Sequence, residues 1–332
     1  MVKTIYFQNT YLYASSTISG PKEKEGPIGE FIDYSFPDEM AGKDSYEKGE
    51  SKMIDQALSL TIQKARMAID EIELIIGGDL TNQIASSNEA VRYYPISFVG
   101  VYGACSTAVL SLIVGSGFVS SCLSENALCF GASNYGSAER QFRYPLEYGV
   151  KKKITATTTA TGAGCGLVSR KMSKVKIVSA TLGRVIDAQW DDVNNMGSAM
   201  AYAAYDSITT HLKNTNTSLK DYDLIVTGDL SEVGSKVLIE LFEDNGYNLV
   251  NYCDAGNLLY DKLKQKDVYC GGSGCACIAI AMYGLVVEKL CRNELKNVLL
   301  IGTGCLHSKI TSSQKQTIPV IAHVINLKRS EE

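Results

Sequence analysis

The residue best suited to covalent chemistry is Cys105, in the segment VYGACSTAVLSL at residues 101–112. We expect a strand over 96–101 to end just before it and an apolar helix to begin just after it. Backbone N–H groups and the dipole at such a helix start favour a thiolate, the nucleophilic form of cysteine. The sequence therefore predicts either an enzyme that acylates Cys105 or a protein that has kept the site and lost the chemistry.

The elements that must position Cys105 occur twice, because three pairs of similar segments recur in the same order. The pairs are IELIIGGDL and YDLIVTGDL (72–80, 222–230), GACSTAVLSLIVGSGFV and GGSGCACIAIAMYGLVV (103–119, 271–287), and NALCFGASN and NVLLIGTGC (126–134, 297–305). Such a recurrence indicates a duplicated unit. Strands this apolar are covered on both faces, as in a mainly parallel sheet wrapped by helices.

Two such halves, each packing a buried helix between the sheets, predict an α/β protein of the thiolase-like kind, a five-layered α/β/α/β/α sandwich. We place the halves at 1–173 and 174–332, because a Lys triplet and a run rich in Thr and Gly interrupt the pattern between Tyr148 and Lys174. Part of that run, TATTTATGAGCGLVS, could instead be a strand that closes the first half. Ligands bind beyond the carboxyl ends of the strands in such sheets. Both Gly-Asp-Leu turns and Cys105 are therefore expected to face one cleft.

Composition restricts the function further. The chain has 332 residues and a formal net charge of −4, which gives no electrostatic footprint for nucleic acid. No apolar run is long enough to span a bilayer, and the first residues lack the apolar core of a signal peptide. The GxG segments lack the rest of a nucleotide-binding fingerprint, so we expect no dinucleotide or other cofactor. Ten cysteines occur without a CxxC pair; except for Cys105 we interpret them as packing thiols in a reducing compartment and expect no metal site.

Several segments carry a more specific resemblance. GACSTA is similar to the nucleophile turn of β-ketoacyl synthases and thiolases. GPKEKEGPIG (20–29), AERQFRYPLEYG (138–149), NMGSAMA (195–201), TGDLSEVGS (227–235) and GGSGCAC (271–277) resemble, in that order, the thiolase-like stage V sporulation protein AD family. The resemblance covers nearly the whole chain.

The resemblance implies a subunit of the spore apparatus for uptake and release of dipicolinic acid, acting in sporulation and germination. It implies binding of dipicolinic acid, with or without calcium, and association with the membrane subunits of the same apparatus. It also implies a protein that is cytoplasmic during synthesis and then peripheral at the spore inner membrane. A homodimer is implied as well, and we expect the strand at 126–131 to be the sheet edge at its interface.

Acyl transfer on this fold needs a His, with a second His or an Asn, besides the cysteine. The resemblance places these partners in the second Gly-Asp-Leu turn and in the GGSG turn, and neither turn contains a histidine. The second Gly-Asp-Leu turn has Gly228 and Asp229 in place of a histidine. An ionised Asp229 would repel a thiolate, but it could also cap a helix together with Glu232, and Asp79 has the same capping role open to it.

The histidines of the chain are His211, His307 and His323. His323 could reach the cleft from the last apolar strand, or it could be a hydrogen-bonded core residue, and we expect His211 on the solvent side of a helix end. Without a base, Cys105 is predicted to be a vestigial nucleophile. We therefore favour a non-catalytic binding protein over the alternative, a ketosynthase-like acyltransferase that uses Cys105.

Dipicolinate is a flat pyridine with two carboxylates, so its site needs cationic side chains, N–H donors and a flat surface. Arg140 and Arg143, each next to an aromatic residue, could supply these or could belong to a dimer interface. Lys22 and Lys24 could add cations or could form a solvated charged loop. The rest of the predicted ligand set is Cys105, Ser106, Asp79, Asp229, Gly272 and His323.

Overall fold

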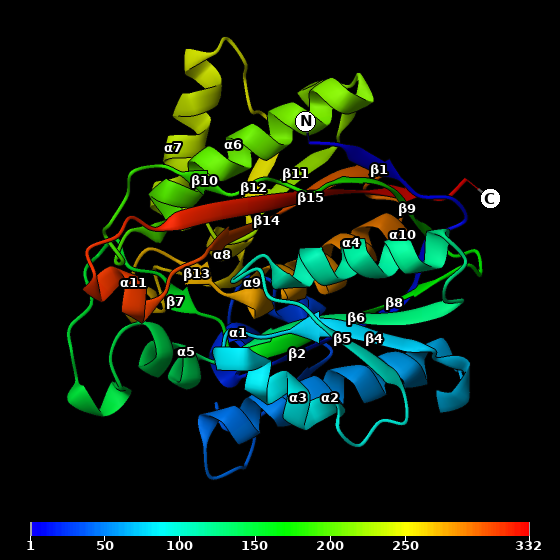
Figure 1. Ribbon diagram of the computed structural model, residues 1–332, viewed down its shortest axis with the longest axis horizontal. Helices are drawn as coiled ribbons and strands as arrows, with labels where there is room; N and C mark the ends of the chain where they lie inside the picture. The colour runs from blue at the N-terminus through cyan, green and yellow to red at the C-terminus, as the bar shows by residue number, and fades with distance from the viewer. Residues whose placement is uncertain (1, 332) are drawn as a thin grey trace.

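The structure, a computed structural model that describes residues 2–331, stacks its elements in five layers (Figure 1). Two helices cover each outer face, and the middle layer is a pair of buried helical segments between two layers of strands. This arrangement confirms the predicted α/β/α/β/α sandwich. The outer helices are α2 (Tyr46–Ala65), α3 (Ala85–Val91), α6 (Met196–Thr215) and α7 (Ser231–Asp244), and the middle ones are α4 (Thr107–Ser120) and the run α9 (Cys275–Ile280), η7 (Ala281–Val286) and α10 (Val287–Cys291).

Each half contributes five strands in an equivalent order, β5-β4-β6-β8-β2 and β12-β11-β14-β15-β9. In each half the first three strands are parallel and the next ones antiparallel, so the expected mainly parallel sheet is in fact mixed. The repeated order confirms the duplication. The strands are β2 (Tyr11–Ser19), β4 (Leu74–Gly78), β5 (Ser97–Gly100), β6 (Asn126–Ser133), β8 (Gly162–Ser169), β9 (Val175–Thr181), β11 (Leu224–Thr227), β12 (Tyr252–Asp254), β14 (Asn297–Cys305) and β15 (Pro319–Arg329).

The two halves are joined rather than independent. β2 pairs with β9 through Tyr11 and Leu12, and β1 (Thr4–Tyr6) adds to the other part of β9. A small parallel ladder between β7 (Thr158–Thr159) and β13 (Gly272–Ser273) forms a second link near the Cys105 end. The predicted boundary at residues 173 and 174 falls in the loop between β8 and β9.

Short elements complete the chain. At the end of the molecule where Cys105 lies, α5 and α11 flank the two-stranded ladder (Figure 1). The short elements are β3 (Tyr34–Ser35), β10 (Ile186–Asp187), α1 (Pro21–Lys24), α5 (Tyr135–Phe142), α8 (Ala255–Leu259), α11 (Lys309–Ser313), η1 (Gly29–Phe31), η2 (Ile69–Glu71), η3 (Asn82–Ile84), η4 (Leu146–Tyr148), η5 (Leu219–Asp221) and η6 (Lys266–Val268).

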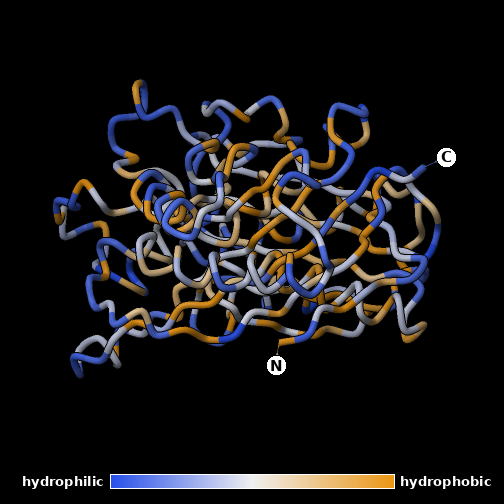
Figure 2. Tube along the Cα trace, turned by 90° about the horizontal axis from the view of Figure 1, so that it is seen from above, coloured by the Kyte–Doolittle hydropathy of each residue, from blue (hydrophilic) through white to orange (hydrophobic). Residues whose placement is uncertain are grey.

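The middle helices are buried because their sequences carry apolar and small residues on every side. Close approach to the strands depends on glycine: a Cβ at Gly131 would lie 2.6 Å from Ala108 Cβ, and one at Gly164 would lie 2.8 Å from Ala279 Cβ. Figure 2 shows the same organisation, with hydrophobic chain concentrated inside and hydrophilic chain at the periphery. Within residues 2–331, no helix combines the length and apolar character needed to cross a membrane.

Several local expectations were wrong. β6 lies between β4 and β8, so the strand at 126–131 is internal; the edge of the first half is the short, partly exposed β5. His211 is buried rather than solvent-facing, because it lies on the sheet side of α6 and bonds Thr181 Oγ1 at 2.8 Å. Cys122 is exposed just beyond the end of α4. The GPKEK segment forms the short helix α1 instead of a loop.

Candidate functional site

Cys105 lies in a tight turn between β5 and α4. The residue before it, Ala104, has a φ of 51°, a left-handed conformation that is uncommon for a residue with a Cβ and is often found at functional sites. The cysteine is half-buried and packs with Leu80, Cys275 and Phe142. Leu80 comes from the first Gly-Asp-Leu turn, so that turn does adjoin Cys105.

The polar groups of this turn bond to one another. The Ser106 hydroxyl donates to Gly103 O at 2.6 Å, and the Thr107 hydroxyl donates to Ala104 O at 2.6 Å. Their backbone N–H groups donate to the same two carbonyls. Ser106 is also fully buried. The Ser106 and Thr107 donors at this helix start are therefore already used.

Asp229, from the second Gly-Asp-Leu turn, faces Cys105. Its carboxyl accepts hydrogen bonds from Thr303 Oγ1 at 2.5 Å and from Gly274 N at 3.4 Å, and it lies close enough to Cys105 for its charge to act on the thiol. Burial raises the pKa of Asp229 to about 6. Burial and then the Asp229 charge raise the pKa of the Cys105 thiol well above its usual range. The expectation of a thiolate at this helix start is therefore wrong, since these two effects outweigh the helix dipole.

The positions that would hold the catalytic partners are closely packed. A Cβ at Gly228 would lie 3.1 Å from Thr303 Oγ1, and one at Gly272 would lie 3.1 Å from Tyr260 Cε2 and 3.2 Å from Cys277 Sγ. A histidine or asparagine there would have to displace these neighbours. The same packing leaves little space for an aromatic ligand at Gly272, which belongs to the predicted ligand set.

Asp254 and Asp79 each cap a helix, whereas Asp229 does not. Asp254, not Asp229, caps α7, because its carboxyl accepts from Leu230 N at 3.0 Å and Ser231 N at 2.8 Å. The predicted capping box of Asp229 with Glu232 is therefore absent among residues 2–331. Asp79 does cap α3, since it accepts from Ser87 N at 2.7 Å as well as from Thr81.

His323 and His307 are bonded to groups other than Cys105, so neither acts as a base for its thiol. His323 accepts a hydrogen bond from Gly183 N at 3.2 Å, and burial lowers its pKa to about 4, as befits a neutral core residue. His307 lies closer to the site: its Nε2 is 3.2 Å from Phe142 O, and its Nδ1 is 3.0 Å from Ser312 Oγ. Phe142 and His307 together form a wall between two cavities.

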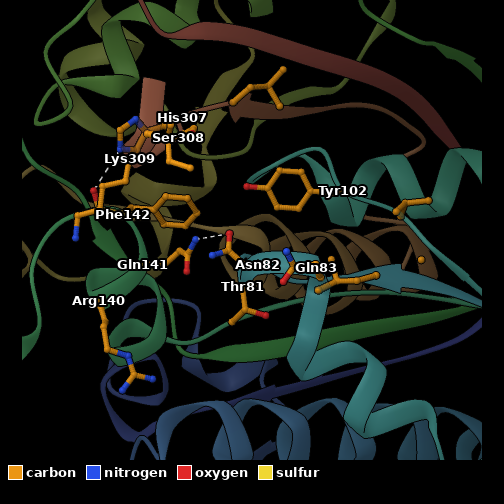
Figure 3. A pocket seen from close by; sticks show the side chains of 15 residues that line it. Thr81, Asn82, Gln83, Tyr102, Arg140, Gln141, Phe142, His307, Ser308 and Lys309 are labelled. Carbon is orange, nitrogen blue, oxygen red and sulfur yellow. Dashed lines mark hydrogen bonds between the residues drawn. The ribbon is translucent and has the colours of Figure 1, made fainter. Parts of the chain in front are cut away.

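The first cavity, of about 720 Å³, opens beside Tyr102 (Figure 3). The Tyr102 ring and Phe142 project into it from opposite sides, and Gln141 Nε2 donates to Asn82 Oδ1 at 2.6 Å across one wall. Arg140 also lines this cavity, but its guanidinium extends toward α2, where it pairs with Glu47. Its guanidinium is therefore already paired with a carboxylate.

The second cavity, of about 640 Å³, lies on the other side of Phe142 and His307. Arg143 and Lys152 line it and both bond Glu139 Oε1, at 2.6 Å and 2.8 Å. Tyr135 and Tyr269 contribute aromatic surface, and the Lys152 ammonium lies 4.5 Å from the centre of the Tyr135 ring. Burial lowers the pKa of Lys152 to about 8.

The predicted ligand residues are thus divided. Arg143 lines a cavity, and Lys22 lies next to it, 5.7 Å from the Tyr135 ring centre and paired with Asp267 at 2.5 Å. Lys24 instead donates to Gly29 O and Ile32 O within its own loop. The structure places Asp229 beside Cys105 and Glu139 beside Arg143. The other predicted ligand residues are bonded to, or packed against, groups elsewhere in the protein: Ser106, Arg140, Lys24, Asp79, Gly272 and His323.

Sequence reasoning missed Lys152, Tyr135, Tyr269 and His307. Lys152 belongs to the Lys triplet that we interpreted only as a break between halves, and Tyr269 begins the GGSG turn. An aromatic residue directly before the AERQFRYP segment was the available signal for Tyr135. Across residues 2–331, no group of three or more His, Cys, Asp or Glu side chains is arranged to hold a metal ion.

Comparison with known proteins agrees with this architecture. The family model described as stage V sporulation protein AD (SpoVAD) matches residues 2–328. The chain is 39% identical over 321 residues to stage V sporulation protein AD of Bacillus subtilis (strain 168), covering 96% of this chain and 94% of that protein.

Solved structures with the same fold include enzymes. An OleA variant from Xanthomonas campestris superposes with a TM-score of 0.64 at 14% identity, covering 98% of this chain and 99% of that one. The 3-oxoacyl-[acyl-carrier-protein] synthase III of Aquifex aeolicus VF5 superposes with a TM-score of 0.59 at 12% identity, covering 96% and 99%. At these identities the likeness establishes a thiolase-like fold and nothing of the activity.

Proposed function

Since the chain belongs to the stage V sporulation protein AD family, we propose that it is a non-catalytic subunit that binds dipicolinic acid. It would act in the uptake of this compound by the developing spore and its release in germination. The family gives the sporulation role, and the site geometry supports binding over catalysis. The proposal includes free dipicolinate and its calcium complex as ligands.

The observation that carries the non-catalytic part is the environment of Cys105. Its thiol lies beside a carboxyl, Asp229, where acyl transfer needs a neutral base or an oxyanion donor. Glycines stand at the partner positions, and Thr303 and Tyr260 fill the adjacent space. A protonated thiol next to an acidic group is a packing and hydrogen-bonding element rather than a nucleophile.

One observation favours the alternative, a ketosynthase-like acyltransferase. Cys105 is half-exposed at a strained turn, and the fold is shared with such enzymes. Incubation with acyl-coenzyme A followed by intact mass measurement separates the two. We expect no stable acyl adduct on the wild-type chain. An adduct that is lost in Cys105→Ala would establish the acyltransferase and overturn the non-catalytic proposal.

The proposal extends to partners and location. In residues 143–154, Lys151 and Lys153 are exposed, whereas Arg143 and Lys152 bond Glu139. The segment also exposes Tyr144, Tyr148, Val150 and Ile154, the last at 86%. Exposed apolar residues among lysines suit a peripheral contact with anionic lipid or with the membrane subunits. We expect Tyr148→Ser with Ile154→Ser to release the chain from the spore inner-membrane fraction, and an unchanged distribution would exclude this surface.

A homodimer is the last part of the proposal. The exposed edge of β5 offers unpaired backbone groups to a second copy, as sheet edges commonly do. We expect light scattering to give twice the chain mass at micromolar concentration. A monomeric mass would exclude the dimer without affecting ligand binding.

A further inference from the structure

The short helix α1, which carries the GPKEK motif, joins the two halves of the molecule through one side chain. Glu23 belongs to the first half and is only 2% exposed. Its Oε1 accepts hydrogen bonds from Thr161 N at 2.9 Å, directly before β8, and from Tyr260 Oη at 2.5 Å, directly after α8 in the second half. A single carboxyl oxygen therefore bonds to both halves.

Further contacts seat α1 on the second half. Lys22 Nζ pairs with Asp267 at 2.5 Å. Gly26 packs so closely against the end of α8 that a Cβ there would lie 1.8 Å from Leu259 O. Thr161 in turn follows the strand β7, which pairs with β13 at the Cys105 end of the molecule. Opening of α1 would therefore loosen the loop that carries Asp267 and the small β7–β13 ladder together.

The Glu23 carboxyl has no cation to balance an ionised form. Among residues 2–331 it takes part in no ion pair, and its second oxygen, Oε2, is buried without a hydrogen-bond partner. A buried charge without a partner costs far more than a buried neutral group that lacks one bond. Burial therefore favours the protonated carboxyl, whose carbonyl oxygen can still accept from Thr161 and Tyr260.

The groups that face Glu23 from the surrounding elements leave this imbalance in place. Lys22 pairs with Asp267, and Lys24 donates to two backbone oxygens of its own loop, so neither neutralises this carboxyl. The ends of β2 and β7 contribute no charged side chain. The other titratable groups around it are Glu39 in the loop before α2, Tyr260 after α8, Cys277 on α9, Glu25 beside α1 and Glu30 on η1.

We propose that Glu23 is a proton-sensitive latch between the two halves. In its protonated form the carboxyl holds α1 closed against Tyr260 and the loop that carries Asp267. In its ionised form it favours an open state, in which α1 leaves the second half and the carboxyl reaches water. The proposal concerns the fold alone and does not rest on the identity of the ligand.

The direction of the effect depends on which state holds the proton more tightly. Burial raises the pKa of Glu23 in the closed state to about 6; the bonds from Thr161 and Tyr260 limit this rise, and nearby Glu39 adds to it. In the open state the carboxyl meets water, so we expect its usual pKa of 4.5. Between these values the closed state binds more protons, so rising pH favours opening. The two pKa values raise the opening constant about eightfold between pH 5 and 7.5.

Hydrogen–deuterium exchange of the full chain, read by mass spectrometry from pH 5 to 7.5 and corrected for the intrinsic rate, measures this opening. We expect protection of α1 and of the Thr161 amide to fall about eightfold over this range. In Glu23→Gln, which keeps the shape but cannot ionise, protection should be nearly independent of pH. Glu25→Gln, an exposed neighbour in the same motif, should behave as wild type. The start of α7, capped by Asp254, is an internal control that Glu23→Gln should leave unchanged.

Three results would overturn the latch. They are wild-type protection of α1 that does not change with pH, the same fall in folded Glu23→Gln, and protection of α1 equal to that of the buried strand β6, which would mean that α1 opens only when the whole chain unfolds. Tyr260→Phe keeps the test decisive if Glu23→Gln does not fold. It removes a bond that favours the ionised carboxyl, so the midpoint of the change should move to higher pH. An unmoved midpoint would also overturn the latch. The proposed function does not depend on any of these results.

Discussion

Replacement of Asp229 by Asn should make Cys105 more reactive. In the wild-type chain the carboxyl accepts a hydrogen bond from Thr303, and its charge opposes formation of a thiolate at Cys105. The pKa of Asp229 is raised only to about 6, so the group is ionised at pH 8. The amide introduced by Asp229→Asn would keep the shape and an acceptor for Thr303 while removing the charge.

The size of the effect follows from Coulomb's law. Two charges roughly 4 Å apart interact by about 4 kcal/mol at an effective dielectric constant of about 20. That energy corresponds to about 3 pKa units at 1.36 kcal/mol each, which is the upper limit of the expected fall in the Cys105 pKa. Burial, the larger cause of the raised pKa, remains in the variant. We therefore expect a rise in the thiolate fraction at pH 8 of at least about tenfold and at most about a thousandfold.

Alkylation by iodoacetamide, followed at the Cys105 peptide by mass spectrometry between pH 7 and 9.5, measures this fraction. Asp79→Asn is the matched control, because Asp79 occupies the equivalent turn of the first half and bonds Thr81 and Ser87 instead of the cysteine. We expect the control to alkylate Cys105 within about twofold of wild type, because Asp79 is not among the groups that raise the pKa of Cys105. An unchanged rate in folded Asp229→Asn, or an equal acceleration in the control, would refute the electrostatic account.

Two further predictions concern pH and stability. The pKa of Lys152 is lowered to about 8, so this side chain loses its positive charge as the pH rises through 8. The affinity for a dicarboxylate should therefore fall between pH 7 and 9. Calorimetry of Lys152→Arg should show a weaker dependence of affinity on pH, because arginine stays charged. Tyr260 donates to the buried Glu23 at 2.5 Å, so Tyr260→Phe should lower the free energy of unfolding by roughly 1–3 kcal/mol in urea at pH 8, while exposed Tyr148→Phe should stay near wild type.

Sequence reasoning reached the fold because its signals were local and repeated. The paired segments around Gly-Asp-Leu indicated which strands correspond, and apolar helices such as α4 could only be buried. It failed for the sheet edge, since an apolar strand such as β6 looks the same at an edge as between two neighbours. Strand order depends on pairing between distant segments, which no single segment reveals.

The site was harder to predict because its residues gain their roles from partners that are distant in the chain. Arg140 and Arg143 look equivalent in sequence and each lines a cavity, but Arg140 pairs with Glu47 on α2 and is half-exposed, whereas Arg143 is buried and pairs with Glu139. The pKa of the Cys105 thiol depends on Asp229, which is 124 positions away in the chain but lies beside it in the fold. The role of Lys152 could not be predicted for the same reason, because only its burial beside Tyr135 distinguishes it from the lysines on either side.

The central claim is that this thiolase-like chain binds dipicolinate without using Cys105 as a nucleophile. Calorimetric titration of dipicolinate into the wild-type chain and Cys105→Ser tests it most directly. The account predicts saturable binding in both, within a few-fold, because serine keeps the size and a donor to Asp229, and it predicts a loss of no more than about 0.5–1.5 kcal/mol for Cys105→Ala. No binding by the wild-type chain, or loss of binding in a folded Cys105→Ser variant, would contradict it.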